Sequence, residues 1–263
     1  MKRLFLLGIL ATGSAWSQVK VSVVGLKIVS KPYQEEGSDQ ELRAFNWSAG
    51  TQVALLIESK GKSIVEMDND KSLVTVFGDD QGTDFLKAKS RFSSRPYEFD
   101  MMAQRSESGK ALLTEIDSPG IPAKGAKVLS LKGELKVVVA SKSEVKKSAK
   151  GAVKEGGKFV IDGKTFTIEE TGKPKWGDDE FEITFKGGYD PQDFKSFEFL
   201  DADGNKLKSK RGSLSSMGGF GKKKVTVSYS FEKKVSEISM QAEVWTDLEK
   251  ISVPFDFKFG AGL

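Results

Sequence analysis

Hydrophobic and polar residues alternate along much of this chain with a period of two. The longest run lies near the C-terminus, where polar or small residues separate Ile251, Val253, Phe255, Phe257 and Phe259. The same alternation occurs in residues 53–57, 97–101, 135–139, 181–185, 225–231 and 238–244. Period-two alternation places one face of a strand on a core and the other in water. No window of a dozen residues keeps helical spacing, so the sequence predicts an all-β protein.

Two short polar stretches predict tight corners between strands. Asp162-Gly163 separates two alternating segments and is typical of a hairpin turn, because both turn positions need positive φ. The stretch FLDADGNKLK begins like a calcium loop at Asp201, but Lys206 stands where such a loop needs glycine and Gly212 where it needs glutamate. We therefore predict a hairpin corner there, with Asp201 bonding the local backbone.

The domain organisation is predicted from a change of composition. Residues 141–158 are rich in lysine and poor in large apolar residues, which is typical of a linker or of a solvated edge strand. We place a domain boundary near residue 153. The expected architecture is two tandem immunoglobulin-like β-sandwich domains, residues 18–152 and 153–263. One elongated β-sandwich is the alternative.

The N-terminus has the layout of a secretory signal peptide over residues 1–17. Two basic residues precede the apolar run LFLLGILA, and small residues follow it. We predict cleavage near Ser17 and export to the periplasm or the extracellular space of a bacterium. No later segment reaches 18 apolar residues, so we expect no membrane span after cleavage.

Composition excludes several kinds of chemistry. The chain has no histidine and no cysteine. Histidine-based acid–base catalysis, Ser-His-Asp triads, thiol nucleophiles and the usual zinc, haem and copper sites need those residues. The formal net charge is +4, from 41 basic and 37 acidic residues, and it falls to +2 without Lys2 and Arg3. This near balance gives no reason to expect nucleic acid as a partner.

One acidic cluster is a candidate calcium site. Asp79 and Asp80 follow the apolar segment LVTVF, and Asp84 lies close behind them. Carboxylates in loops at one end of a sandwich can combine to bind calcium. Solvated turns use the same residues, and we expect no other cofactor.

The candidate interaction residues are Met217, Phe220, Trp176 and Trp245. The first two lie in RGSLSSMGGFGKKK, which lacks the spacing of a phosphate loop and reads as a long hairpin loop between Leu207 and Val225. Trp245 is predicted to lie on the face opposite Ile238 and Val244, where an exposed tryptophan can stack on sugars. Covering the second sheet face or the junction between the domains is the alternative role of both tryptophans.

These observations leave three functional hypotheses. The first is an exported, non-catalytic protein that binds another protein or serves as a structural spacer. The second is a carbohydrate-binding module that recognises a cell-surface glycan through exposed tryptophans. The third is a glycoside hydrolase that uses two carboxylates. No motif in the chain points to a particular family.

Overall fold

The computed structural model describes residues 19–43, 48–88, 96–100, 103–189, 191, 194–219 and 222–262. These residues form β-strands and turns, including the short 3-10 turn η3 (Phe85–Lys87), and no α-helix. The all-β prediction is confirmed. The predicted signal peptide lies outside the described residues.

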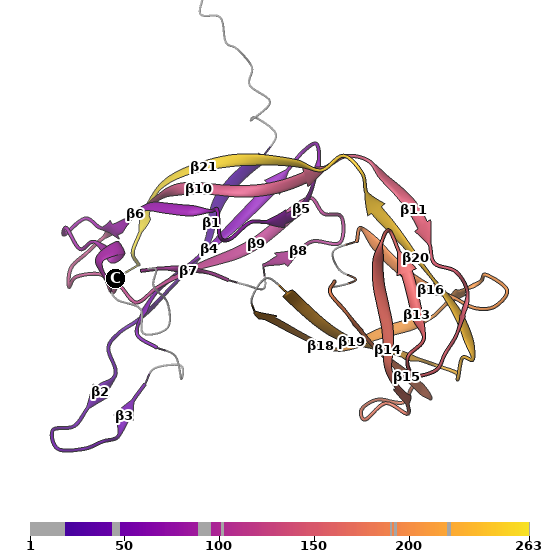
Figure 1. Ribbon diagram of the computed structural model, residues 1–263. Coiled ribbons are helices and arrows are strands. Elements are labelled where there is room, and N and C mark those ends of the chain that lie inside the picture. Colours follow the sequence, from indigo (N-terminus) through magenta and orange to yellow (C-terminus); the bar gives the residue numbers. More distant parts are fainter. Residues whose placement is uncertain are drawn as a thin grey trace, which may run out of the picture. The chain divides into compact units, whose positions relative to one another are not determined.

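The described chain divides into two compact units (Figure 1). Unit 1 contains the residues up to Val139 together with those from Glu249 on, and unit 2 is Ala140–Leu248. Each unit has its own buried core. Unit 2 is therefore inserted into the chain of unit 1.

Unit 1 contains two antiparallel sheets. The first has the order β1 (Val19–Val29), β4 (Gly50–Ser59), β9 (Ala111–Ser118) and β7 (Glu98–Phe99), with β8 (Gln104–Arg105) also on β9. In the second, β10 (Val128–Ala140) pairs with β21 (Glu249–Gly260) on one side and with β5 (Ser63–Met67) and β6 (Leu73–Asp79) on the other. A separate pair consists of β2 (Tyr33–Gln34) and β3 (Glu41–Leu42).

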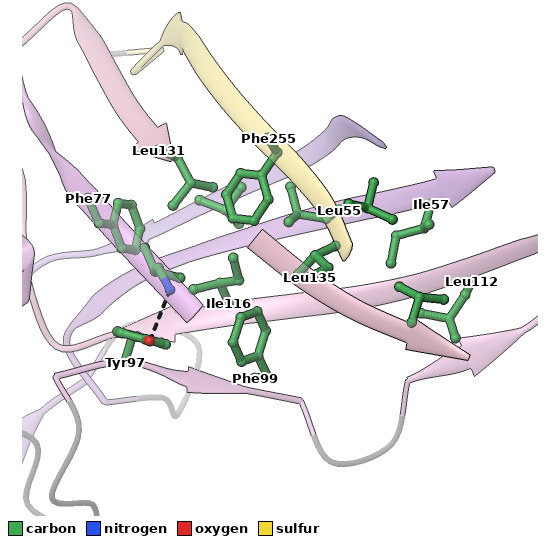
Figure 2. Packing of buried hydrophobic residues seen from close by; sticks show 14 of the residues in the cluster. Leu55, Ile57, Phe77, Tyr97, Phe99, Leu112, Ile116, Leu131, Leu135 and Phe255 are labelled. Carbon is green, nitrogen blue, oxygen red and sulfur yellow. Dashed lines mark hydrogen bonds between the residues drawn. The ribbon is translucent and has the colours of Figure 1, made fainter. Parts of the chain in front are cut away.

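The core of unit 1 lies between its two sheets (Figure 2). Leu55 of β4 and Ile116 of β9 come from the first sheet, and Leu135 of β10 from the second; all three are fully buried. The phenol oxygen of Tyr97 accepts a hydrogen bond of 3.0 Å from the backbone N–H of Val74. A buried tyrosine hydroxyl needs such a partner, and this one ties the loop before β7 to β6.

Unit 2 also contains two antiparallel sheets. The first has the order β13 (Lys158–Ile161), β14 (Lys164–Gly172), β15 (Phe181–Gly187), β19 (Lys222–Phe231) and β18 (Ser209–Gly219). The second has the order β11 (Ser143–Lys147), β20 (Glu237–Trp245), β16 (Ser196–Leu200) and β17 (Lys206–Leu207), with β12 (Gly151–Ala152) also on β20.

Aromatic rings fill the core of unit 2. The ring of Phe199 lies 5.6 Å from that of Phe185, 4.9 Å from that of Tyr229 and 5.3 Å from that of Phe231, centroid to centroid. These residues come from both sheets, as expected for a β-sandwich. Pairs at such distances contribute beyond the area that they bury.

Both predicted corners are confirmed. Asp162 and Gly163 have φ of 50° and 73°, and they join β13 to β14. The carboxylate of Asp201 accepts backbone N–H bonds of 2.9 Å from Asp203 and 2.8 Å from Asn205, between β16 and β17. These bonds hold the pKa of Asp201 below its usual value.

The division into units differs from the expected boundary near residue 153. The C-terminal strand β21 pairs with β10 along its length, from Val128↔Gly260 to Val139↔Glu249, so it completes unit 1 instead of a second sequential domain. Residues 141–158 contribute the strands β11 and β12, which pair with β20, in agreement with the edge-strand interpretation. Composition marks an edge strand but does not say which distant strand it joins.

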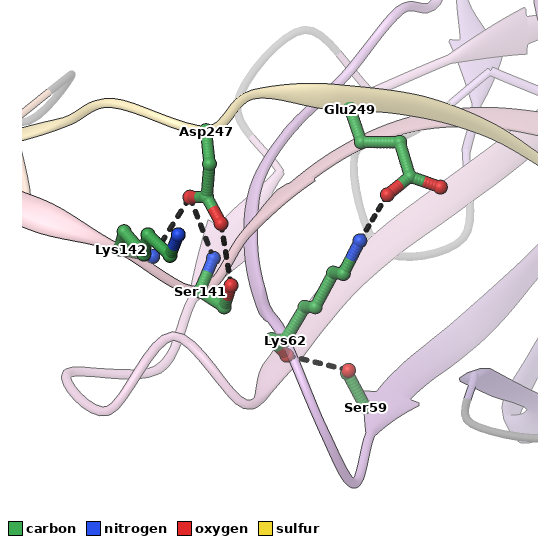
Figure 3. A network of polar contacts seen from close by, with 6 residues as sticks. All are labelled: Ser59, Lys62, Ser141, Lys142, Asp247 and Glu249. Carbon is green, nitrogen blue, oxygen red and sulfur yellow. Dashed lines mark hydrogen bonds and ion pairs between the residues drawn. The ribbon is translucent and has the colours of Figure 1, made fainter.

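The chain passes between the units at two neighbouring points, and each side has its own polar contacts (Figure 3). In unit 2, the Asp247 carboxylate accepts backbone N–H bonds from Ser141 at 2.9 Å and Lys142 at 2.7 Å, as well as the Ser141 hydroxyl. These bonds, the Ser141 hydroxyl first, lower the pKa of Asp247 to about 2. In unit 1, Lys62 forms an ion pair with Glu249.

Candidate interaction site

A two-stranded arm, residues 31–43, lies outside both sheets of unit 1. Its strands β2 and β3 pair only with each other in the described chain, with Tyr33 opposite Leu42. It leaves the first sheet where Val29 pairs with Gly50, and it extends beyond the ends of β1 and β4 (Figure 1). Tyr33 is 65% exposed and Leu42 is 59% exposed. The arm therefore presents a cross-strand apolar pair that the described core does not cover.

The tip of the arm is acidic. Arg43 neutralises Glu41 through two bonds, from Nε at 3.0 Å and from Nη2 at 2.6 Å. Glu35, Glu36 and Asp39 are exposed and form no ion pair within the residues that the structure describes. Three unpaired carboxylates thus lie next to the apolar pair.

A groove of about 210 Å³ lies on unit 1, beside the loop that joins β5 to β6. Part of its lining is apolar, from Val137, Val138 and Ile251, and Ser252 adds a hydroxyl. The charged lining residues are Asp68, Lys71, Lys136 and Lys250. The groove thus combines an apolar lining with three ammonium groups and one carboxylate.

The charges of this groove are partly paired. Lys71 Nζ lies 3.0 Å from a carboxylate oxygen of Asp68, and its hydrogen bond holds the pKa of Asp68 below its usual value. Lys136 pairs with Glu134. Among the described residues, no ion pair involves Lys250. Three lysines therefore face two carboxylates, those of Asp68 and Glu134, and the net charge is +1.

The calcium candidates accept backbone N–H groups, some from their own turn and some from the distant segment 123–127. Asp79 accepts N–H bonds of 2.7 Å from Ala123 and 2.8 Å from Thr83. Burial acts to raise the pKa of Asp79, but these bonds outweigh it and the pKa is lowered. Asp80 and Asp84 each accept one backbone N–H at 3.0 Å. Across the described ranges, no three His, Cys, Asp or Glu residues gather as metal ligands. All three aspartates thus have backbone donors, and calcium binding by them stays a prediction.

The two candidate tryptophans lie on different elements. Trp245 is on the outer face of β20, as predicted, and the Lys195 ammonium lies 5.4 Å from the centroid of its ring. Lys195 is held there by Glu243 at 2.6 Å. Trp176 lies in the loop between β14 and β15 and is 89% exposed. Because a lysine covers one face of Trp245, Trp176 is the more open of the two rings.

The expected loop between Leu207 and Val225 is largely strand, so this prediction was wrong. β18 and β19 form a long hairpin in which Met217 pairs with Lys224. Phe220 lies outside the described residues. The segment GSLSSMGG lacks an alternating apolar pattern, so the sequence did not predict a strand there. As an edge strand, β18 is held by backbone pairing with β19, and β19 supplies the core residues.

Carboxylates also gather on the outer face of the first sheet of unit 1. Glu98 lies opposite Asp117 in the ladder of β7 and β9, and Glu115 lies two positions away on the same face. Partial desolvation, then the charges of Glu115 and Glu98, raise the pKa of Asp117. Asp117 is itself exposed, which reduces the effect of desolvation. The hydrolase hypothesis needs two neighbouring carboxylates, and Glu98 and Asp117 are such a pair on this face.

Sequence reasoning did not find the arm or the groove. The stretch PYQEEGSDQEL has a glycine turn between Tyr33 and Leu42, and this signal could have predicted a short hairpin. The groove had no local signal, because its residues come from three separate segments of the chain.

The described residues contain no helix that is long and apolar enough to cross a membrane. Comparison with family models, with curated proteins and with solved structures gives no match.

Proposed function

We propose that this chain is an exported, non-catalytic protein of the bacterial envelope, and that it binds another protein through the arm. The observation that carries the proposal is the exposed pair of Tyr33 and Leu42 on a hairpin that belongs to neither sheet. The export signal predicted for residues 1–17 supports the location.

The physical argument starts from the stability of the arm. An isolated two-stranded hairpin is at best marginally stable in water. A cross-strand apolar pair contributes about 0.2–1 kcal/mol. Burying a large apolar side chain against a partner contributes about 1.5–3 kcal/mol. A binding partner would therefore stabilise the arm more than its own cross-strand contacts do.

We further propose that each unit is an immunoglobulin-like sandwich, and that unit 1 acts as a support for the arm. Two antiparallel sheets around one core in each unit support this proposal. The insertion of one unit into the other replaces the tandem order expected from the sequence.

A photo-crosslinking amino acid at position 33 tests the function in living cells. We expect this position to give a discrete crosslinked species. The matched control is position 160, because Val160 is also an exposed apolar residue on a strand, at 52%. The double substitution Glu35→Lys and Glu36→Lys should abolish the crosslink from position 33. Equal labelling from positions 33 and 160, or none from position 33, would contradict the proposal.

Carbohydrate binding is the second candidate function, and the exposure of Trp176 is the observation that favours it. A glycan that protects tryptophan fluorescence from a quencher would support it. The substitution Trp176→Ala should then remove the protection, whereas Tyr33→Ser should not.

A further inference from the structure

We propose that the arm of one copy docks in the groove of a second copy, so that the protein assembles head to tail. The proposal rests on the arm as a binding element and names its partner. The groove is the lysine-containing surface of unit 1 described above, lined by Lys71, Lys136 and Lys250.

The groove is large enough for an aromatic side chain. An engineered apolar cavity of about 150 Å³ binds benzene, and this groove measures about 210 Å³. Val138 and Ile251 supply apolar lining for the ring of Tyr33, which is otherwise 65% exposed. Size and polarity therefore match between the two surfaces.

The charges of the two surfaces are complementary. Glu35, Glu36 and Asp39 lie at the tip of the arm, next to the apolar pair, and form no ion pair in the described chain. Lys250 provides an ammonium group that forms no ion pair among the same residues, although its charge also acts on Asp68, and Lys71 lies in the same groove. Opposite charges at the rim of an interface steer association and fix its orientation.

One copy cannot satisfy its own groove. The arm leaves unit 1 at the Val29 end of β1, where Val29 pairs with Gly50. The groove lies toward the other end of the sandwich, where the turn after Ser59 leads into β5 and the Asp68 N–H bonds the Lys136 carbonyl at 2.8 Å. The ten residues of β4 span about 30 Å between these ends. Figure 1 shows the arm extending away from the sandwich.

The proposed contact limits the form and strength of the assembly. Arm and groove are different surfaces, so the assembly closes as a reciprocal dimer or a larger ring, or it continues as an open chain. One small hairpin in one groove buries less than about 1,200 Å², the range of weak and transient contacts. We therefore expect micromolar to submillimolar association.

Sedimentation velocity of the purified protein over a wide concentration range tests this inference. We expect a mass that grows with concentration at about 0.02 M salt and falls toward the monomer at about 0.5 M, because the Debye length shortens several-fold. Tyr33→Ser should weaken association about tenfold or more. Lys71→Glu with Lys250→Glu, and separately Glu35→Lys with Glu36→Lys, should do the same.

Charge exchange makes the test specific. The groove-reversed variant carries Lys71→Glu with Lys250→Glu, and the arm-reversed variant carries Glu35→Lys with Glu36→Lys. The two variants should associate when mixed, because the first still has a native arm and the second still has a native groove. A chain that carries all four substitutions should regain self-association. The matched controls are Lys173→Glu with Lys175→Glu and Glu155→Lys with Asp178→Lys, which alter exposed charges of unit 2 and should leave the mass unchanged.

Two outcomes would overturn the proposal. The first is a monomer at every concentration and salt. The second is association that the reversals do not weaken while the thermal transition stays unchanged. If the protein is monomeric but position 33 still crosslinks a different protein in cells, the proposed function stands and self-assembly is rejected. If position 33 crosslinks nothing, both fail together.

Discussion

The two units use different means to build a sandwich of similar design. The core of unit 2 is rich in phenylalanine and comes from one continuous segment, Ala140–Leu248. The core of unit 1 consists mainly of Val, Leu and Ile, and it comes from two segments that join only when β21 pairs with β10. Unit 2 can therefore complete its core from local chain, whereas unit 1 depends on the last strand.

The insertion point explains why both units tolerate this arrangement. Val139 and Glu249 are cross-strand neighbours in unit 1, and Ser143 and Trp245 are cross-strand neighbours in unit 2. In each unit, the two segments that lead to the other unit are neighbouring strands of one sheet. Neither unit therefore has to distort its sheets to accommodate the connection. Domain insertion is tolerated where the two ends of the inserted segment lie close together.

Deleting residues 249–263 would test the comparison most strongly. We expect unit 1 to lose its protection from hydrogen exchange, because the deletion removes Val253 and Phe255 from the core and leaves β10 without its long partner. Unit 2 should keep its protection, and excised Ala140–Leu248 should fold alone. Exchange measured peptide by peptide checks this. Loss of protection confined to residues 153–248 would instead favour the tandem order.

A smaller effect is expected from single core truncations. Phe199→Ala should destabilise unit 2 by about 3–5 kcal/mol, since a fully buried aromatic ring leaves a cavity. Leu55→Ala is the matched change in unit 1, at about 2–5 kcal/mol. In urea, each variant should shift only the transition of its own unit. A shift of both transitions by either variant would show that the units unfold together.

The pH dependence of unit 2 should sharpen the comparison further. The pKa of Asp247 is lowered from 3.8 to about 2, so its carboxylate stabilises unit 2 above pH 3.8, and this contribution is lost as pH falls through about 2. Asp247→Asn should flatten this part of the profile for unit 2 and leave unit 1 unchanged. Melting temperatures between these pH values check it, and an unaltered slope would contradict the role of Asp247.

The smallest effect on stability is expected in the arm. Tyr33→Ser should change the free energy of unfolding of unit 1 by less than about 0.5 kcal/mol, because exposed side chains away from special features contribute little. The same substitution should weaken self-association about tenfold or more in sedimentation velocity. A large loss of stability would show instead that Tyr33 belongs to the fold of unit 1.

Particular residues show what could be predicted and what could not. The alternation of Val225, Val227, Tyr229 and Phe231 correctly placed them in the core, and Asp162-Gly163 correctly placed a turn. Both signals are local, since they depend on strand pleat and on the backbone freedom of neighbouring residues. The exposure of Tyr33 and Leu42 in the arm was missed, because residues this hydrophobic occur both in cores and on surfaces.

The sequence by itself determined the all-β class and the inward face of most strands. It also excluded the chemistry that needs histidine or cysteine. Only the tertiary structure decided that β21 returns to β10, that Asp79 accepts the N–H of the distant Ala123, and that Lys71, Lys136 and Lys250 line one groove. The physical reason is that a strand's pattern fixes which face is buried but not which distant strand it pairs with. That choice depends on how all the apolar faces are covered at once.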